Sequence, residues 1–254
     1  MALPRTPSFR LDGKRALVTG GTRGIGLGAA VALAEAGAAV TIAARTAGDI
    51  EIVVNQMADA GLAAEGVALD ITDSDAVKAF VGDVEPFQVL VNSAGTARHS
   101  SFADITPANY QAVMDLNLAA TLFVSQAVVA RLVQAGLAGS IIHVSSQMGH
   151  VGGPARAVYA ASKFAVEGLS KAMAIELGAS DIRVNTVCPT FIETDLTAKT
   201  LSDPEFRNWV LSKIKLGRLG RVEDIMGPIV FLASDAAALV TGTALLVDGG
   251  WTAE

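Results

Sequence analysis

The sequence has 254 residues, of which 51% are hydrophobic and 17% are charged, and its formal net charge is −6. No run of Lys or Arg is longer than two residues, so the chain lacks the basic patch by which proteins bind nucleic acid or anionic membranes. The one cysteine, Cys188, excludes an internal disulfide.

The apolar residues are divided among separate segments. Residues 1–15 contain prolines and arginines but no apolar core, which argues against a secretory signal. The longest apolar segment, residues 29–44, contains Glu35 and Gly37, so we expect no membrane span. We therefore expect a cytoplasmic protein whose partners are small molecules or copies of itself.

The first predicted unit is a strand, a glycine-rich loop, a helix and a second strand. Residues 15–19 form a short β-type run, and the loop 20–26 (GGTRGIG) follows directly. Residues 27–36 are predicted to be helical up to Gly37, and residues 39–43 form the second strand. This order is a βαβ unit.

Further strands are predicted along the chain. Residues 89–91 are apolar without alternation, which is typical of a parallel strand covered on both faces. We therefore predict an α/β fold: a single-domain, Rossmann-type, doubly wound parallel sheet with helices on both faces, spanning residues 1–254. Residues 190–217 resemble an insertion over the sheet and are the candidate substrate lid. The further predicted strands are 64–69, 89–92, 140–145, 183–188 and 244–247.

The glycine-rich loop is a candidate phosphate-binding turn. Gly20, Gly24 and Gly26 permit a tight turn and a close approach of the backbone to a pyrophosphate, whose charge the next helix N-terminus would stabilise. The loop follows a strand and opens a helix, which is the context that such a motif requires. A tight turn without a ligand is the alternative.

The residues at the end of the second strand indicate whether the site would bind NAD or NADP. An NAD site usually has an acidic residue there, whereas residues 43–46 are AART. Arg45, together with Arg23 in the glycine loop, would bind a 2′-phosphate through charge-assisted hydrogen bonds. This favours NADP(H), with NAD(H) possible. The alternative is that both arginines are solvated on the surface.

A candidate proton donor lies in the second half of the chain. Tyr159 and Lys163 are four residues apart on a predicted helix, so both project from one face. A positive charge near a phenol lowers its pKa, which allows a tyrosine to act as a general acid or base. Ser146 follows the predicted strand 140–145, at the end where parallel sheets bind ligands. The Tyr-Lys spacing alone is also common on surface helices.

Taken together, these motifs resemble the classical short-chain dehydrogenase/reductase family over nearly the whole chain. Residues 19–26 resemble its cofactor loop, residues 92–95 (NSAG) its Asn-Asn-Ala-Gly turn, and residues 248–250 (DGG) its closing motif. The residues that match its catalytic set are Asn117, Ser146, Tyr159 and Lys163.

The resemblance also implies a set of cofactor-binding residues. Asp70, after the third strand, resembles the residue that contacts the adenine, and Thr194 falls where the family places a hydroxyl near the carboxamide. The full implied set is Gly20, Thr22, Arg23, Gly24, Ile25, Gly26, Arg45, Asp70, Ile71, Asn92, Ala94, Gly95, Tyr159, Lys163, Pro189, Thr190, Ile192 and Thr194.

The implied activity is hydride transfer that interconverts a carbonyl, either ketone or aldehyde, and an alcohol. In that scheme Ser146 polarises the carbonyl oxygen and Tyr159 protonates it. Lys163 holds the nicotinamide ribose and lowers the pKa of Tyr159, while Asn117 keeps a water in the proton relay. The resemblance implies no metal, and it implies a homotetramer, for which the apolar segment 230–251 is a candidate interface. An NAD-dependent alcohol or polyol dehydrogenase of the same fold and a non-catalytic dinucleotide-binding sensor are the alternatives.

One departure from the family pattern lies after the strand 183–188. The family commonly has Pro-Gly where this chain has Pro189-Thr190. The added side chain should change the shape of the pocket near the nicotinamide. Among the other polar residues, His143 is expected to pack against a helix, and solvation is the expectation for Arg98, His99, Gln147, His150 and Arg156.

Overall fold

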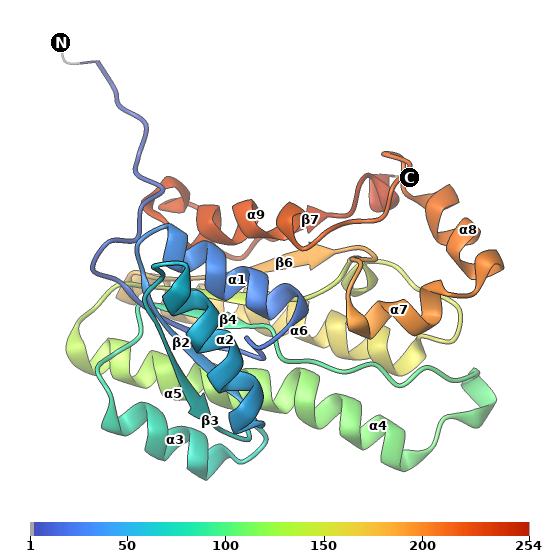
Figure 1. Ribbon diagram of the computed structural model, residues 1–254, viewed down its shortest axis with the longest axis horizontal. Helices are drawn as coiled ribbons and strands as arrows, with labels where there is room; N and C mark the ends of the chain where they lie inside the picture. The colour runs from blue at the N-terminus through green and yellow to red at the C-terminus, as the bar shows by residue number, and fades with distance from the viewer. Residues whose placement is uncertain (1–2, 254) are drawn as a thin grey trace.

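A seven-stranded parallel sheet forms the centre of the molecule (Figure 1). The structure is a computed structural model that describes residues 3–253. The strand order is β3-β2-β1-β4-β5-β6-β7, which confirms the predicted doubly wound sheet. The strands are β1 (Arg15–Thr19), β2 (Ala39–Ala44), β3 (Ala64–Ala68), β4 (Val89–Asn92), β5 (Gly139–Val144), β6 (Ile182–Pro189) and β7 (Ala244–Val247).

The predicted strands agree with these bounds to within one residue at each end. The largest difference is in β6, which is one residue longer at both ends than the predicted 183–188. It pairs with β5 on one side and β7 on the other, so its hydrogen bonds continue to Pro189. Pairing with neighbours, rather than local propensity, sets such strand ends.

Helices cover both faces of the sheet. The first face is covered by α1 (Gly24–Glu35), α2 (Ala47–Asp59) and α9 (Glu223–Ala233). The second face is covered by α3 (Ser74–Asp83), α5 (Ala120–Ala135) and α6 (Ala157–Leu177). Alternate residues of β1 serve the two cores, since Ala16 and Val18 face α1 whereas Leu17 packs on the α5 side.

The remaining helices lie near the end of the sheet to which the strands point (Figure 1). They are α4 (Pro107–Met114), α7 (Asp195–Leu201) and α8 (Pro204–Lys213). Asp203 caps α8 by accepting hydrogen bonds from two backbone amides, and Pro204 occupies its first position. The short 3₁₀ turns are Phe102–Asp104, Gln147–Gly149, Gly178–Ser180, Asp235–Ala237 and Trp251–Ala253.

A long apolar helical run crosses the second face. It continues from α4 through a π-helical turn, Asp115–Ala119, into α5. Among the described residues this run, 107–135, is the one helical stretch long and apolar enough to span a membrane. Val124, Val128 and Leu132 are buried against the sheet, so packing on the core accounts for part of its apolar composition.

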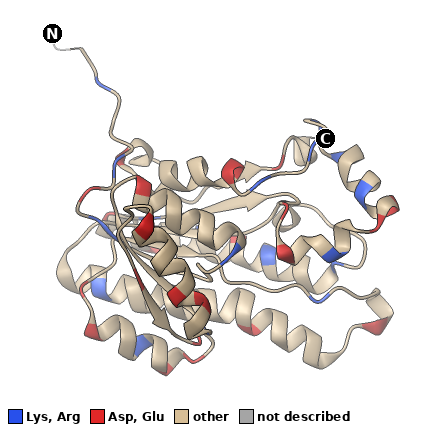
Figure 2. Cartoon of the chain, in the orientation of Figure 1, with Lys and Arg blue, Asp and Glu red and all other residues tan. Residues whose placement is uncertain are grey.

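The charged residues are distributed over many elements. Figure 2 shows acidic and basic positions interspersed on α3, α7 and α8, whereas α2 carries acidic positions alone.

Candidate active site

The carboxyl ends of β1 and β4 lie side by side, and the glycine loop follows β1 at this point. Thr19 pairs with Asn92, although β2, β3 and the helices α1, α2 and α3 separate the two strands in the chain. The order of strand connections reverses here, and such a switch point is where doubly wound sheets bind ligands.

The glycine loop is packed too closely to accept side chains. A Cβ built on Gly26 lies 2.2 Å from the carbonyl oxygen of Gly20, and one built on Gly20 lies 2.9 Å from the Cα of Ala94. Gly20 and Gly24 also have φ values of +68° and +53°, which favour glycine. The backbone of the loop is therefore not covered by side chains of these glycines at the switch point.

The N-terminus of α1 has unpaired hydrogen-bond donors. The helix begins at Gly24, three residues earlier than predicted, because the last glycines of the loop form its first turn. Arg23 at the N-cap makes no side-chain capping bond, and the first turn contains no acidic residue. The backbone amides there are free to bind an anion. Thr22 and Ile25 lie in this loop and are partly buried.

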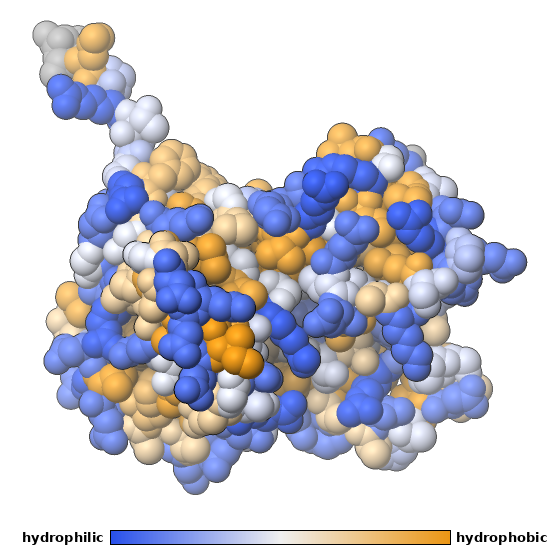
Figure 3. Space-filling model, in the orientation of Figure 1, coloured by the Kyte–Doolittle hydropathy of each residue, from blue (hydrophilic) through white to orange (hydrophobic). Residues whose placement is uncertain are grey.

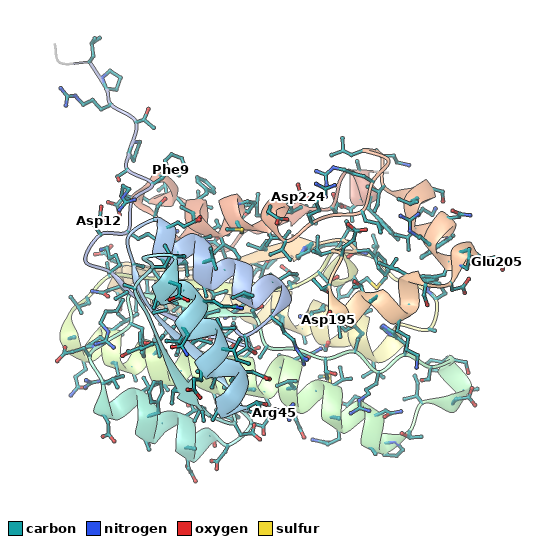
Figure 4. The ribbon with its side chains drawn as sticks, viewed as in Figure 1. Phe9, Asp12, Arg45, Asp195, Glu205 and Asp224 are labelled. Atoms are coloured by element: carbon teal, nitrogen blue, oxygen red, sulfur yellow. The ribbon has the colours of Figure 1, made fainter. Side chains whose placement is uncertain are left out.

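The two arginines predicted to hold a 2′-phosphate are both exposed. Figure 4 shows Arg45 near the start of α2, at the end of the molecule to which β2 points. Its charge is one of the influences that lower the pKa of Asp70, although hydrogen bonds from Thr72 are the larger ones. Asp70 and Arg45 are thus close enough to interact. Ile71 is buried in the second core.

The turn after β4 connects the glycine loop with Asn117 and Lys163, two of the predicted catalytic residues. Thr19 accepts hydrogen bonds from the amides of Ser93 and Ala94 through its hydroxyl, at 3.2 and 3.3 Å. Asn92 is buried, and its amide donates to Ser125 at 2.9 Å. A Cβ built on Gly95 would lie 3.3 Å from Asn117 Oδ1 and 4.0 Å from Lys163 Nζ. Asn117 and Lys163 therefore meet at Gly95.

Asn117 lies in the π-helical turn between α4 and α5. Its Oδ1 accepts from the Thr96 amide at 2.8 Å, and its Nδ2 donates to the Thr96 carbonyl oxygen at 3.0 Å. Nδ2 also lies 3.1 Å from the Ser162 hydroxyl on α6. π-helical turns are often found at functional sites, because they present a side chain that a regular helix would place elsewhere.

Ser146 and Tyr159 line a common cavity. Ser146 caps the turn after β5, accepting from the Met148 amide at 3.1 Å and donating to Gln147 Oε1 at 2.8 Å. The cavity is lined by Ala97, His99, Ser146, Gln147, Met148, Arg156, Tyr159, Thr190, Phe191, Leu196, Thr197 and Thr200.

The structure differs from the expected effect of Lys163 on Tyr159. Burial raises the pKa of Tyr159, and the opposing influences come from Ser146 and Arg156 rather than from Lys163. Nζ of Lys163 instead donates to the Val144 carbonyl oxygen at 2.8 Å, 5.6 Å from the Tyr159 ring centroid. Burial lowers the pKa of Lys163 itself to about 8. Desolvation is therefore the largest influence on the pKa of both groups.

The chain after β6 lies opposite the glycine loop. A Cβ built on Gly24 would lie 3.4 Å from Thr194 Cγ2, so Thr194 borders the crevice. Pro189 ends β6, and the hydroxyl of Thr190 is buried without a hydrogen-bond partner. Ile192 is buried in the first core, so its backbone rather than its side chain is available to a ligand.

Two of the residues expected to be solvated are buried. Gln147 is 2% exposed and Arg156 is 6% exposed, so the expectation was wrong for both. Arg156 packs over Phe206, 5.3 Å from the ring centroid, and Phe206 contacts Phe191 and Trp209. Figure 3 shows apolar surface beside α8, where these aromatic side chains lie. The one available sequence signal was the position of Arg156, one helical turn before Tyr159.

Behind the site lies a second polar cluster that was not predicted from the sequence. The Cys188 thiol donates to Glu167 Oε1 at 3.2 Å and lies 3.4 Å from His150 Nε2. Thr186 donates to the other Glu167 oxygen at 3.0 Å. These bonds satisfy a buried carboxylate whose charge acts on Lys163. His143, as predicted, is packed between helices, against Ser125 and Ser170.

The chain resembles known proteins over almost its whole length. A family model described as enoyl-(acyl carrier protein) reductase matches residues 20–252. D-erythrulose reductase from Gallus gallus is 43% identical over 245 residues, which cover 96% of this chain and 98% of that protein.

Solved structures match as closely in fold. A gluconate 5-dehydrogenase from Burkholderia cenocepacia, in complex with NADP and tartrate, superposes with a TM-score of 0.93 at 36% identity, covering 97% of this chain and 98% of that chain. A short-chain type dehydrogenase/reductase from Mycobacterium marinum superposes with a TM-score of 0.91 at 36% identity, with the same two coverages.

Proposed function

Because the chain belongs to the classical short-chain dehydrogenase/reductase family, whose members exchange carbonyl and alcohol groups, we propose that it is an NADP(H)-preferring enzyme for a polyhydroxylated ketone and the corresponding alcohol. The observation that carries the proposal is the meeting of Asn117 and Lys163 at Gly95, beside the cavity of Ser146 and Tyr159. The glycine loop, whose backbone is not covered by side chains, borders the place where Asn117 and Lys163 come together.

The residues present fit a dinucleotide. The loop of Gly20 and Gly26 has no room for a Cβ, and the uncapped start of α1 offers backbone donors to a pyrophosphate. Lys163 is in position to hold the nicotinamide ribose, with Thr194 on the opposite wall. Two other residues of the predicted cofactor set, Ile71 and Ile192, have side chains that are buried in the two cores.

The preference for NADP(H) rests on Arg23 and Arg45. Both are exposed near the glycine loop and the end of β2, and residues 43–46 supply no carboxylate to bind the ribose hydroxyls. A 2′-phosphate between two guanidinium groups would form charge-assisted hydrogen bonds. The solved relative from Burkholderia cenocepacia binds NADP, which supports the proposal. An NAD-dependent polyol dehydrogenase of the same fold is the alternative.

The catalytic roles follow from the positions of the side chains. When bound, the nicotinamide supplies or accepts a hydride at the carbonyl carbon. Ser146 and Tyr159 line the same cavity, where Ser146 donates a hydrogen bond to the carbonyl oxygen and Tyr159 gives it a proton. Lys163 stabilises the tyrosinate that remains. Asn117 holds the Thr96 backbone and the start of the proton relay.

The proposed substrate class is a sugar or a polyol. The cavity offers several hydrogen-bonding side chains beside Tyr159, including Gln147 and Thr190, whose Nε2 and Oγ1 atoms lack partners within the described residues. The relatives named above are an erythrulose reductase and a gluconate dehydrogenase, so one name denotes a neutral sugar and the other an acid. Residues 190–217, which include α7 and α8, would form the lid.

The proposed assembly is a homotetramer in the cytoplasm. Within the predicted interface segment 230–251, Leu239 and Leu246 are exposed, and Phe164 and Ile175 are exposed on α6. Exposed apolar side chains of this size favour contact with another copy of the chain. Light scattering on the purified protein measures the mass directly, and a monomer at micromolar concentration would contradict the proposal.

The test of function is the initial rate of NADPH oxidation, and separately NADH oxidation, over ketones, aldehydes, diketones and keto-sugars. We expect turnover with NADPH, and in Tyr159→Phe a loss of about 10²- to 10⁴-fold in kcat with cofactor affinity unchanged. Retained turnover in Tyr159→Phe would contradict the mechanism. Arg45→Ala should raise the KM for NADPH but not for NADH, and a wild-type preference for NADH would refute the arginine assignment.

A further inference from the structure

The guanidinium group of Arg156 is buried in the active-site cavity without an acidic partner. The residue is 6% exposed, and its Nη2 atom has no hydrogen-bond partner. Nη1 makes a long contact of 3.5 Å with the Pro154 carbonyl oxygen, and the group lies over the Phe206 ring. Among residues 3–253, no Asp or Glu forms an ion pair with it.

A buried charge of this kind is unfavourable unless an opposite charge meets it. Burial of a cation costs several kcal/mol, and hydrogen bonds or a counter-ion must offset that penalty. The aromatic ring of Phe206 offsets a part, since a cation over a ring face is attracted by its electrons. The Nη2 donor is left for a group that enters from the cavity.

The backbone also holds Arg156 in this place. Ala155, the preceding residue, has a φ of +55°, in a region that side chains other than glycine rarely adopt. Arg156 then begins α6 without using its side chain as a cap. A strained turn is therefore maintained while the guanidinium is directed into the cavity rather than into solvent.

The rest of the cavity is suited to an anion. Its lining contains no Asp, Glu or Lys. His99 is neutral near pH 7, because burial and the charge of Arg156 lower its pKa to about 4. Gln147 adds an amide nitrogen that lacks a partner. Arg156 is thus the one formal charge on the lining, and no carboxylate there would repel an anion.

We propose that Arg156 binds a carboxylate of the substrate, so that the enzyme acts on a sugar acid, reducing a keto-aldonate to the aldonate. This inference rests on the proposed function and names its substrate class. The carboxylate is not altered in the reaction. Hydride from NADPH and a proton from Tyr159 convert the ketone C=O into CH–OH, and NADPH is oxidised to NADP⁺.

A carboxylate fits the cavity better than a phosphate does. A carboxylate carries one charge and matches the fork of a single guanidinium. A phosphate carries nearly two charges and three acceptor oxygens, for which several cations or a helix N-terminus are the usual partners. The cavity supplies one cation, and Arg156 itself occupies the first position before α6.

The test compares acids with neutral ketoses that differ only in the carboxylate. One pair is 5-keto-D-gluconate and L-sorbose, and the other is 2-keto-D-gluconate and D-fructose, each reduced with saturating NADPH. In at least one pair we expect the acid to have a kcat/KM about 30- to 100-fold higher than the neutral ketose, which is the range of a charge-assisted hydrogen bond.

Variants at Arg156 identify the group responsible. Arg156→Met removes a charge near Tyr159 and can slow both substrates, so the measure is the ratio of kcat/KM for the acid to kcat/KM for the neutral ketose, which should fall by about 30- to 100-fold, chiefly through KM for the acid. Arg156→Lys should recover part of the loss, since it keeps the charge without the fork. Arg98→Met is the matched control, because Arg98 is an exposed arginine of the neighbouring loop and does not line the cavity.

The outcomes are distinct. If neutral ketoses are reduced as efficiently as the acids in both pairs, or if Arg156→Met keeps the preference for the acid, the inference is wrong while the proposed function stands. If D-fructose 6-phosphate is preferred over both acids and its KM depends on Arg156, the ligand is a phosphate and the carboxylate assignment fails. If NADPH reduces no ketone, aldehyde or keto-acid, the proposed function fails, and the inference fails with it.

Discussion

The amide of Asn117 donates a hydrogen bond to the hydroxyl of Ser162, 3.1 Å away, and that hydroxyl donates to the backbone carbonyl of Tyr159 at 2.7 Å. These two bonds connect the π-helical turn to α6, the helix that carries Tyr159. Asn117 also holds the backbone of Thr96 on its other side. The three segments around the site are therefore fixed to one another by one amide group.

A double-mutant cycle at Asn117 and Ser162 measures this connection. Ser162→Ala removes one acceptor and should lower the free energy of unfolding by about 1 kcal/mol, and Asn117→Ala, which also leaves the Thr96 amide unpaired, by about 2 to 3 kcal/mol. The double variant should lose less than the sum, by at least about 0.5 kcal/mol. Strict additivity in urea denaturation would show that the two side chains do not interact.

We expect two glycine-to-alanine variants, one in the glycine loop and one outside it, to differ sharply in their affinity for NADPH. Gly26→Ala places a Cβ 2.2 Å from the Gly20 carbonyl oxygen, so the loop must shift, and we expect NADPH affinity to fall by at least about 100-fold. Gly48→Ala, on α2, has no atom within 4 Å of the new Cβ and should leave affinity unchanged. Titration of cofactor fluorescence measures both. Equal affinities in the two variants would rule out a close approach of the loop to the cofactor.

His143 makes the fold sensitive to acid. Burial, and secondarily the charge of Lys163, lower the pKa of His143 to about 3. The unfolded chain takes up this proton near pH 6.5 and the folded chain does not, so stability is lost as pH falls below about 6.5. Between pH 7 and pH 5 this group should remove about 2 kcal/mol from the free energy of unfolding. His143→Gln does not titrate, so its decline over that range should be smaller by this amount; parallel pH profiles would refute the assignment.

The thiol of Cys188 should be inert in the folded protein. Burial, together with the charge of Glu167, raises its pKa to about 12. The thiolate is the reactive form, so iodoacetamide at mildly alkaline pH should leave the native protein unmodified and alkylate it once in denaturant. The chain contains one cysteine, which makes the mass shift unambiguous. Modification of the native protein within minutes would show that the cluster opens.

Much of the fold follows from local sequence. Strands covered on both faces are continuous apolar runs, so β1 and β4 were predicted with their observed bounds. The glycine loop and the Tyr159–Lys163 spacing were recognisable because each motif depends on residues close together in the chain.

The burial of Arg156 could not be predicted in this way. Its environment is made by Phe206 on α8 and by an aromatic cluster that includes Trp251, so residues up to about a hundred positions away decide it. The raised pKa of Tyr159 has the same origin, because desolvation depends on how the chain beyond β6 packs over the cavity. The spacing of residues along the sequence reveals neither the burial of Arg156 nor the desolvation of Tyr159.

Helix α6 carries Arg156 at its start, then Tyr159, Ser162 and Lys163 within its first two turns. A helix advances about 1.5 Å per residue, so the backbones of Arg156, the proposed anion-binding residue, and Tyr159, the proposed proton donor, lie about 4.5 Å apart along the helix axis. This spacing sets the number of carbon atoms that can separate the carboxylate from the reacting carbonyl in a substrate that Arg156 and Tyr159 contact at the same time. A homologous enzyme could adopt a shorter or longer substrate by moving the charged group along this helix, with the reacting centre left in place.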